Sequence, residues 1–384
     1  MPSLDADPFA DIRPYSDDEV PAVVARLRND PELADALARL KLKGLNRWLP
    51  GLARFAVRRW LNWALSGLRT VDDFQILVKP QLERVIASTA SFTFDGLEQL
   101  SADESWLFIS NHRDISMDPA LTNLVIHASG HRTLAIAIGD NLIKRAWVAD
   151  LMRLNKCFLV RRNITAPREL MAASKQLASF MRWMISENRG PVWIAQREGR
   201  AKDGIDATEP AVIKMLTLSR DRGAESVAEV LSSLKIVPLA ISYELDPCDG
   251  LKAAALALGD AYTKGDDEDV LSIGLGISGQ KGRVHLSFGT PISGDDLDVE
   301  SVAAVIDLHI RNRYRLYENA LWAWQMLEGT TDVPPVDFYQ GTITRSEFEG
   351  RIRALPEEHR PYALAMYANP LRAVLADQGI HLAG

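Results

Sequence analysis

The chain has 384 residues, of which 47% are hydrophobic; this can bury a large core and excludes disorder over the whole length. Two cysteines exclude a disulfide scaffold and suit a reducing compartment, and the net charge of −7 argues against a nucleic-acid partner. The acidic N-terminus is unlike a secretory signal and no apolar stretch reaches about 18 residues, so we expect a cytoplasmic protein.

Basic and aromatic residues concentrate between residues 36 and 70. This stretch holds eight Lys and Arg and no acid, so the rest of the chain carries −15 (−7 minus +8). Two helical segments, 32–49 and 51–69, are expected here, broken at Pro50-Gly51. The pattern fits either a helical hairpin packed on the core or a helix lying in the interface of an anionic membrane. The second segment spaces large apolar residues as a helix does: Leu52, Phe55, Trp60 and Trp63.

Strands and helices alternate through residues 92–290, which predicts an α/β fold with a mostly parallel sheet flanked by helices. LSIGLGIS and GRVHLSFG are expected as paired strands that add an antiparallel element. Trailing helices are expected over 298–328 and 344–378. We therefore divide the chain into three segments: an N-terminal helical region (1–90), an α/β domain (91–297) and a C-terminal helical extension (298–384).

The segment ISNHRDISMDPAL, residues 109–121, carries the clearest chemical signal. His112 follows a buried strand, and α/β sheets place ligand chemistry at the carboxyl ends of their strands. Its imidazole can act as a general base, and Asp118 or Asp114 can fix its tautomer. A plainer interpretation makes Asp118 the N-cap of a helix that Pro119 begins. A third interpretation is that His112, Asp114 and Asp118 are ligands of a divalent metal ion.

Three more segments follow in order: KCFLVRR (156–162), WIAQREGRAKDG (193–204) and IVPLAISY (236–243). With the first, they resemble the four-block pattern of the glycerolipid acyltransferases, the glycerol-3-phosphate and lysophosphatidate acyltransferase superfamily. The resemblance covers roughly residues 90–295. Two departures indicate a divergent branch. Five residues rather than four separate His112 from Asp118, and Gly199 adjoins Arg200 where one residue usually intervenes.

The resemblance implies a role for each matching residue. His112 becomes the catalytic base and Asp118 its partner, with Asp114 as the competing partner. The resemblance assigns acceptor binding to five residues: Arg161, Arg162, Glu198, Gly199 and Arg200. Arg161 and Arg162, if on one strand, point to opposite faces, so only one of them reaches the substrate.

Some of these roles stay open. Arg197 and Lys202 compete with Arg200 for the acceptor phosphate. Pro238, in the fourth block, is associated with shaping the acyl-donor site. Backbone N–H groups near Pro119 are expected to stabilise the oxyanion.

The resemblance also implies a reaction, its substrates and a location. The enzyme is expected to move a fatty acyl group from acyl-CoA or acyl carrier protein to a glycerol-3-phosphate or lysophospholipid-type hydroxyl, without metal or cofactor. A lipid-like product favours the membrane interpretation of residues 36–70, with the protein peripheral on the inner face of the cell membrane. The alternatives are a metal-dependent phosphoester hydrolase using His112, Asp114 and Asp118, and a noncatalytic lipid-binding protein of the same fold.

Overall fold

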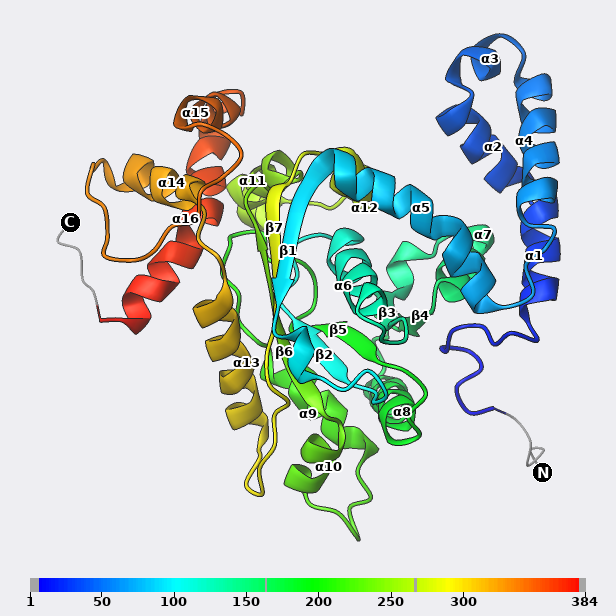
Figure 1. The fold of residues 1–384 in the computed structure, drawn as a ribbon, viewed down its shortest axis with the longest axis horizontal. Helices are drawn as coiled ribbons and strands as arrows, with labels where there is room; N and C mark the ends of the chain where they lie inside the picture. Colours follow the sequence, from blue (N-terminus) through cyan, green and yellow to red (C-terminus); the bar gives the residue numbers. More distant parts are fainter. Residues whose placement is uncertain (1–6, 163, 266–267, 380–384) are drawn as a thin grey trace. The chain divides into compact units, whose positions relative to one another are not determined.

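The computed structural model describes residues 7–162, 164–265 and 268–379 (Figure 1). Clustering of contacts gives two compact units. The first is Met1–Gln81 with Ala135–Ala173, and the second is Leu82–Leu134 with Ser174–Gly384. This division differs from the three segments expected from the sequence, because residues 135–173 group with the N-terminal helices. The three segments stay a prediction about function, and each compact unit is described by itself.

The first unit is a helical cluster with two parallel strands. Prolines open α2 and α4, and the Asp30 carboxylate caps α2 by accepting from the Leu33 N–H at 2.8 Å. The break expected at Pro50 is confirmed, since α4 begins there. The hydrophobic core of the first unit includes Val20, Leu27, Val57 and Leu61. The elements are α1 (Val20–Asn29), α2 (Pro31–Lys41), α3 (Lys43–Trp48), α4 (Pro50–Ala64), α5 (Val71–Thr89, which runs into the second unit), β3 (Ala135–Gly139), α7 (Ala146–Leu154) and β4 (Cys157–Val160).

The strands form a seven-stranded sheet in the order β1-β7-β6-β2-β5-β3-β4. The pairs β1–β7, β2–β6, β2–β5 and β3–β4 are parallel, and β6–β7 is antiparallel. The predicted α/β fold with a mostly parallel sheet and an antiparallel addition is therefore confirmed. The strands of the second unit are β1 (Ala90–Asp95), β2 (Leu107–Ser110), β5 (Val192–Ala195), β6 (Ile236–Tyr243) and β7 (Gly282–Phe288).

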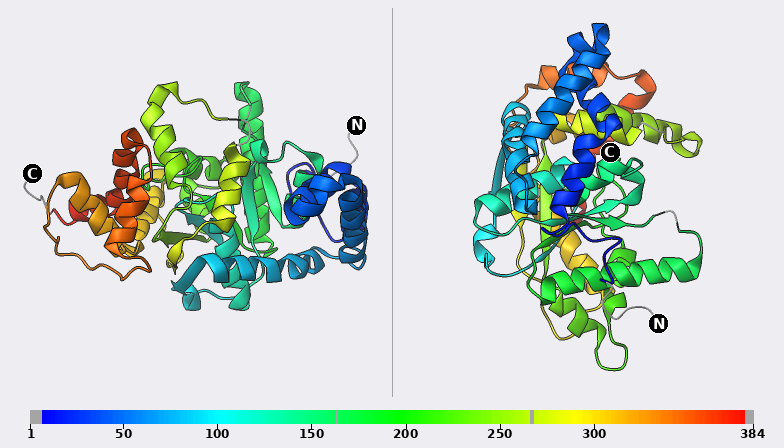
Figure 2. Two further views of the ribbon diagram at one scale, coloured as in Figure 1. Left: turned by 90° about the horizontal axis from the view of Figure 1, so that it is seen from above. Right: turned by 90° about the vertical axis from the view of Figure 1, so that its right-hand side faces the viewer.

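The helices of the second unit lie on the sheet and beyond it. α13 packs against β6, and α14, α15 and α16 pack together, as the left view of Figure 2 shows in orange and red. These helices are α6 (Met117–Ala128), α8 (Pro167–Ser186, which begins in the first unit), α9 (Pro210–Leu216), α10 (Val227–Ser233), α11 (Asp249–Leu258), α12 (Glu268–Ser278), α13 (Val299–Arg313), α14 (Glu318–Glu328), α15 (Arg345–Arg353) and α16 (Arg360–Asp377).

One expected strand is a helix. The run LSIGLGIS lies in α12, so its predicted strand pairing is wrong. A short apolar run does not distinguish a strand from a helix by periodicity. Glu268 and Asp269 occupy the first turn, where negative charge stabilises a helix. The second expected strand does form, as β7, but its antiparallel partner is β6.

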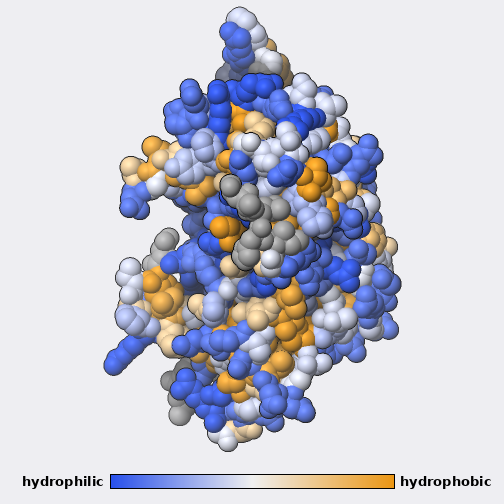
Figure 3. Space-filling model, turned by 90° about the vertical axis from the view of Figure 1, so that its left-hand side faces the viewer, coloured by the Kyte–Doolittle hydropathy of each residue, from blue (hydrophilic) through white to orange (hydrophobic). Residues whose placement is uncertain are grey.

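The C-terminal extension is helical, as expected, and has its own core. Trp324, Phe348 and Leu371 are buried in that core, together with Ala253 of α11. Figure 3 shows the face that carries these helices, and hydrophilic residues cover most of it. Apolar residues gather over its lower part. On α13, Val305 and Leu308 are exposed.

Candidate active site

The loop that carries His112 is fixed to the sheet on two sides. It follows β2, all four residues of which are buried. The Asn111 amide donates to the Ile241 carbonyl at 2.9 Å and accepts from the Ile241 N–H at 2.8 Å, as a strand neighbour would. The carbonyl of His112 accepts from the Ala201 N–H at 2.9 Å. This last bond brings the loop after β5, with the third motif block, against the histidine loop.

His112 and Asp118 form a hydrogen-bonded pair. Nδ1 of His112 lies 2.8 Å from Oδ2 of Asp118, whose side chain is fully buried. Because a carboxylate only accepts hydrogen bonds, Nδ1 carries a proton in this pair, and in the neutral imidazole Nε2 then keeps its lone pair. The same Oδ2 accepts from the N–H groups of Arg113 at 2.6 Å and Asp114 at 2.9 Å, and Oδ1 accepts from the Tyr243 hydroxyl at 2.7 Å. Asp118 is therefore held from all sides in the orientation that fixes the imidazole.

Asp114, the competing partner, has a different role in the structure. Its Oδ1 accepts from the N–H groups of Ser116 at 3.0 Å and Met117 at 2.9 Å, at the start of α6. Burial, and next the charge of Asp118, raise the pKa of the Asp114 carboxyl. The expectation that Asp118 caps the helix is wrong: α6 begins at Met117 and Asp118 lies in its first turn. One carboxylate thus binds the start of the helix while the other holds His112.

The backbone N–H groups around the start of α6 are already occupied. Those of Arg113 and Asp114 bind Asp118, and those of Ser116 and Met117 bind Asp114. These four groups are therefore not free to stabilise an oxyanion in this conformation. The expectation that N–H groups near Pro119 do so stays a prediction.

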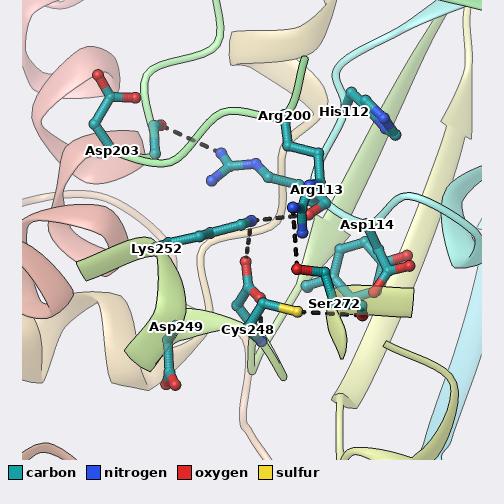
Figure 4. A network of polar contacts seen from close by, with 12 residues as sticks. His112, Arg113, Asp114, Arg200, Asp203, Cys248, Asp249, Lys252 and Ser272 are labelled. Atoms are coloured by element: carbon teal, nitrogen blue, oxygen red, sulfur yellow. Dashed lines mark hydrogen bonds and ion pairs between the residues drawn. The ribbon is translucent and has the colours of Figure 1, made fainter. Parts of the chain in front are cut away.

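The third motif block lies on the loop after β5. Glu198 is exposed, Gly199 has a φ of +73° that favours glycine, and the Arg200 guanidinium donates to the Ser272 hydroxyl of α12 at 3.3 Å. The side chain of Lys202 instead lies over the Tyr262 ring at 4.2 Å. Figure 4 shows Arg200 extending toward Ser272, with the His112 ring apart from that contact. The structure thus brings the third block to the histidine loop through the backbone.

Two buried ion pairs brace the residue after His112. Arg113 pairs with Asp206 at 2.6 Å, and Lys252 pairs with Asp246 and donates to the Arg113 carbonyl at 2.8 Å (Figure 4). Burial alone would lower the pKa of Arg113, but the Asp206 carboxylate more than offsets this and raises it. Burial would raise the pKa of Asp246, yet the Lys252 ammonium lowers it. These charges are paired structural groups at neutral pH.

Arg161 and Arg162 lie in the first unit. β4 ends at Val160, so both follow the strand rather than lie on it, and the expected alternation between faces does not apply. Arg161 forms an ion pair with Asp11, and the Arg162 N–H donates to Asp140 at 3.2 Å. Both residues are exposed, and their role in acceptor binding stays a prediction.

Sequence reasoning missed two side chains beside His112. Tyr243 binds the far oxygen of Asp118, and the Trp193 ring lies 5.7 Å from the His112 ring in an edge arrangement. Both residues stand in the quoted motif blocks, at the end of β6 and within β5. The order of strands in the sheet brings them to the site, and sequence spacing does not reveal that order.

The other candidates for chemistry outside the His112 loop are cysteine nucleophiles, metal ligands and cavities. Burial raises the pKa of Cys157 to about 12 and of Cys248 to about 11, which disfavours a thiolate nucleophile. In the described part of the chain, no three His, Cys, Asp or Glu residues converge as metal ligands. Two cavities of the second unit, of about 20 and about 380 Å³, are not lined by His112.

Among the described helices, none has the length and apolar character needed to cross a bilayer.

Two comparisons with known proteins find a similarity. One solved structure to which this chain is similar is the 1-acyl-sn-glycerophosphate (LPA) acyltransferase PlsC from Thermotoga maritima. It is 11% identical, and the match covers 77% of this chain and 95% of that one with a TM-score of 0.34. A search of the curated proteins finds no match. The family model described as Acyltransferase matches residues 91–242, which include His112 and Asp118. This match agrees with the family expected from the sequence, over these residues.

Proposed function

We propose that this protein transfers a fatty acyl group from acyl-CoA or acyl carrier protein to the hydroxyl of a glycerol phosphate or lysophospholipid-type acceptor. His112 is the general base. The observation that carries the proposal is the 2.8 Å contact between His112 Nδ1 and the buried Asp118, since it leaves Nε2 as the proton acceptor. The acyltransferase match around these residues supports it.

The reaction needs one base and one activated donor. Nε2 of His112 takes the proton of the acceptor hydroxyl as its oxygen attacks the thioester carbonyl carbon. The C–O bond forms and the carbonyl electron pair moves onto oxygen. The tetrahedral intermediate then collapses, the C–S bond breaks, and the departing thiolate takes the proton from the imidazolium. Asp118 stabilises the imidazolium between these two steps.

Cationic side chains are assigned to the acceptor phosphate. Arg200 is the nearest candidate by connectivity, because its loop bonds to the His112 carbonyl. Arg161 and Arg162 follow from the resemblance, and Glu198 and Gly199 complete the acceptor-binding block. A guanidinium suits this role because its planar donors match the geometry of phosphate oxygens.

The first unit supplies the surface for an anionic membrane. Helix α4 buries Ala53, Val57 and Leu61 in the core of its own unit, so its remaining apolar residues face outward. Four large apolar side chains of α4 are 41–76% exposed: Leu52, Phe55, Trp60 and Trp63. Arg54, Arg58 and Arg59 are exposed on the same helix. Tryptophans and arginines together suit the headgroup layer of an anionic bilayer, so we place the protein peripherally on the inner face of the cell membrane.

The test is a thiol-release assay of the purified chain across acyl-CoA and acyl carrier protein donors and several acceptors, with mass measurement of the lipid formed. His112→Ala should reduce acyl transfer at least about 10²-fold, the usual range for a positioned general base. His127→Ala, an exposed histidine of α6, is the matched control.

Each contrary result has a clear meaning. A folded His112→Ala variant with full activity would remove His112 from the mechanism. Loss of activity on addition of a metal chelator would favour the metal-dependent phosphoester hydrolase. Vesicle binding without turnover of any thioester would favour the lipid-binding protein.

A further inference from the structure

Tyr243 ends β6 and meets the carboxylate that orients His112. Its hydroxyl donates to Oδ1 of Asp118 at 2.7 Å, whereas His112 binds Oδ2. The two side chains are 125 residues apart in sequence. Tyr243 is buried, and burial, followed by the charge of Asp118, raises the pKa of its phenol well above the usual value. The phenol therefore stays a hydrogen-bond donor throughout the neutral pH range.

The two carboxylate oxygens of Asp118 accept hydrogen bonds from different parts of the fold. Oδ2 accepts from His112 and from two backbone N–H groups, and all three donors belong to the loop between β2 and α6. Oδ1 accepts from Tyr243, which belongs to the sheet. The tyrosine is thus the contact that joins the carboxylate to the end of β6, whereas the donors to Oδ2 come from the loop before α6. Without it, the hydrogen bonds to Oδ2 alone would set the rotation of the carboxyl.

The backbone on both sides of Tyr243 is firmly held. Two residues earlier, Ile241 exchanges two hydrogen bonds with the Asn111 side chain. One residue later, the buried Glu244 carboxylate accepts from the N–H groups of Arg283 at 2.8 Å and Thr342 at 2.6 Å. Thr342 lies between α14 and α15, so the C-terminal extension also fixes this end of β6. A hydroxyl carried on such a strand end has little freedom to leave Asp118.

We propose that Tyr243 is a positioning residue for the acyl transfer, holding the Asp118 carboxylate in the plane from which it orients the His112 imidazole. This inference rests on the proposed function and adds a residue to it. The Tyr243 hydroxyl binds Oδ1 of Asp118, so its effect on His112 passes through Asp118. Its removal should therefore lower the rate of the chemical step while substrate binding stays the same.

The test compares Tyr243→Phe with Tyr367→Phe. Tyr367 is a matched control, because it is also buried and its hydroxyl donates to a different carboxylate, Asp249, at 2.8 Å. We expect Tyr243→Phe to lower kcat about tenfold with KM within about twofold, since a slightly misplaced base loses part of its contribution. The control should keep kcat. Equal kcat values for Tyr243→Phe and the wild type would overturn the inference.

A double-mutant cycle separates positioning from general damage. In an Asp118→Asn background, Tyr243→Phe should have no further effect on kcat, because the group through which it acts is already changed. A second full loss in that background would show that Tyr243 acts by another route. Should Tyr243→Phe melt early, 3-fluorotyrosine at position 243 keeps the hydroxyl and alters its donor strength. A change in kcat there, with none from the same substitution at 367, supports the inference, and no change opposes it.

An NMR readout works without turnover. The ring ¹⁵N signals of His112 should shift in Tyr243→Phe and stay in place in Tyr367→Phe. If the wild type transfers no acyl group but these signals respond in this way, the proposed function fails and the positioning contact stands. If acyl transfer occurs and neither kcat nor the ring signals respond, the positioning contact fails and the proposed function stands.

Discussion

The arginines of helix α4 and the arginine beside His112 lie in very different surroundings. Arg58 and Arg59 are exposed beside exposed tryptophans, whereas Arg113 is buried and pairs with Asp206. A charge in water interacts weakly and is screened by salt, while a buried charge must be paired to persist. The same residue type therefore serves two purposes. Exposed arginines suit a reversible contact with an anionic partner, and the buried one fixes the geometry of the His112 loop.

The buried pair should give the largest effect when it is broken. Arg113→Met leaves the Asp206 carboxylate without its guanidinium partner, and the side chains of both residues are less than 10% exposed. The free energy of unfolding should fall by about 3–5 kcal/mol, the usual result of stranding one buried charge. Urea titration followed by circular dichroism measures this change.

The matching control replaces both charges. In Arg113→Met with Asp206→Leu, most of the lost stability should return, since no unpaired charge remains. If the single variant were as stable as the wild type, the pair would behave like a surface pair and the contrast drawn here would fail.

The exposed arginines should affect binding and leave stability unchanged. Replacing Arg54, Arg58 and Arg59 by serine should weaken binding to anionic vesicles by up to about 100-fold at low salt, at about 1 kcal/mol for each charge near the surface. Vesicle sedimentation at several salt concentrations measures this, and the wild-type affinity should fall as salt rises.

The control for this prediction removes the same number of charges from a different surface. Serine at Arg222, Arg313 and Arg353, three exposed arginines of the second unit, should leave vesicle binding intact. Equal losses in the two triple variants would mean that net charge, rather than the α4 surface, governs binding.

Sequence patterns predicted the parts of this molecule that depend on local order. The alternation of strands and helices predicted the α/β fold, and the family resemblance pointed to Asp118 as the partner of His112, with Asp114 as the competing partner, in spite of the unusual spacing. Contacts between distant segments were not predictable, because Tyr243 and Asp118 meet only through the order of the strands. The strand prediction for LSIGLGIS failed for a different reason. Within α12 this run buries Ser272 and Gly276 and exposes Leu271 and Ile277, the reverse of an ordinary helix.

The smallest predicted effect belongs to an ion pair at the surface. Arg182 pairs with Glu225, and this hydrogen bond is the main cause that lowers the pKa of Glu225 to about 2. Because the folded pKa lies below the unfolded value, the contribution is complete above the unfolded pKa and is lost as the pH falls toward about 2. Glu225→Gln should therefore lower the melting temperature slightly at pH 7, by an amount that shrinks steadily below about pH 4.5. Melting curves of both proteins from pH 7 down to the lowest pH at which they stay folded measure the difference. A gap that stays constant across this range would show that Glu225 acts through packing rather than through its charge.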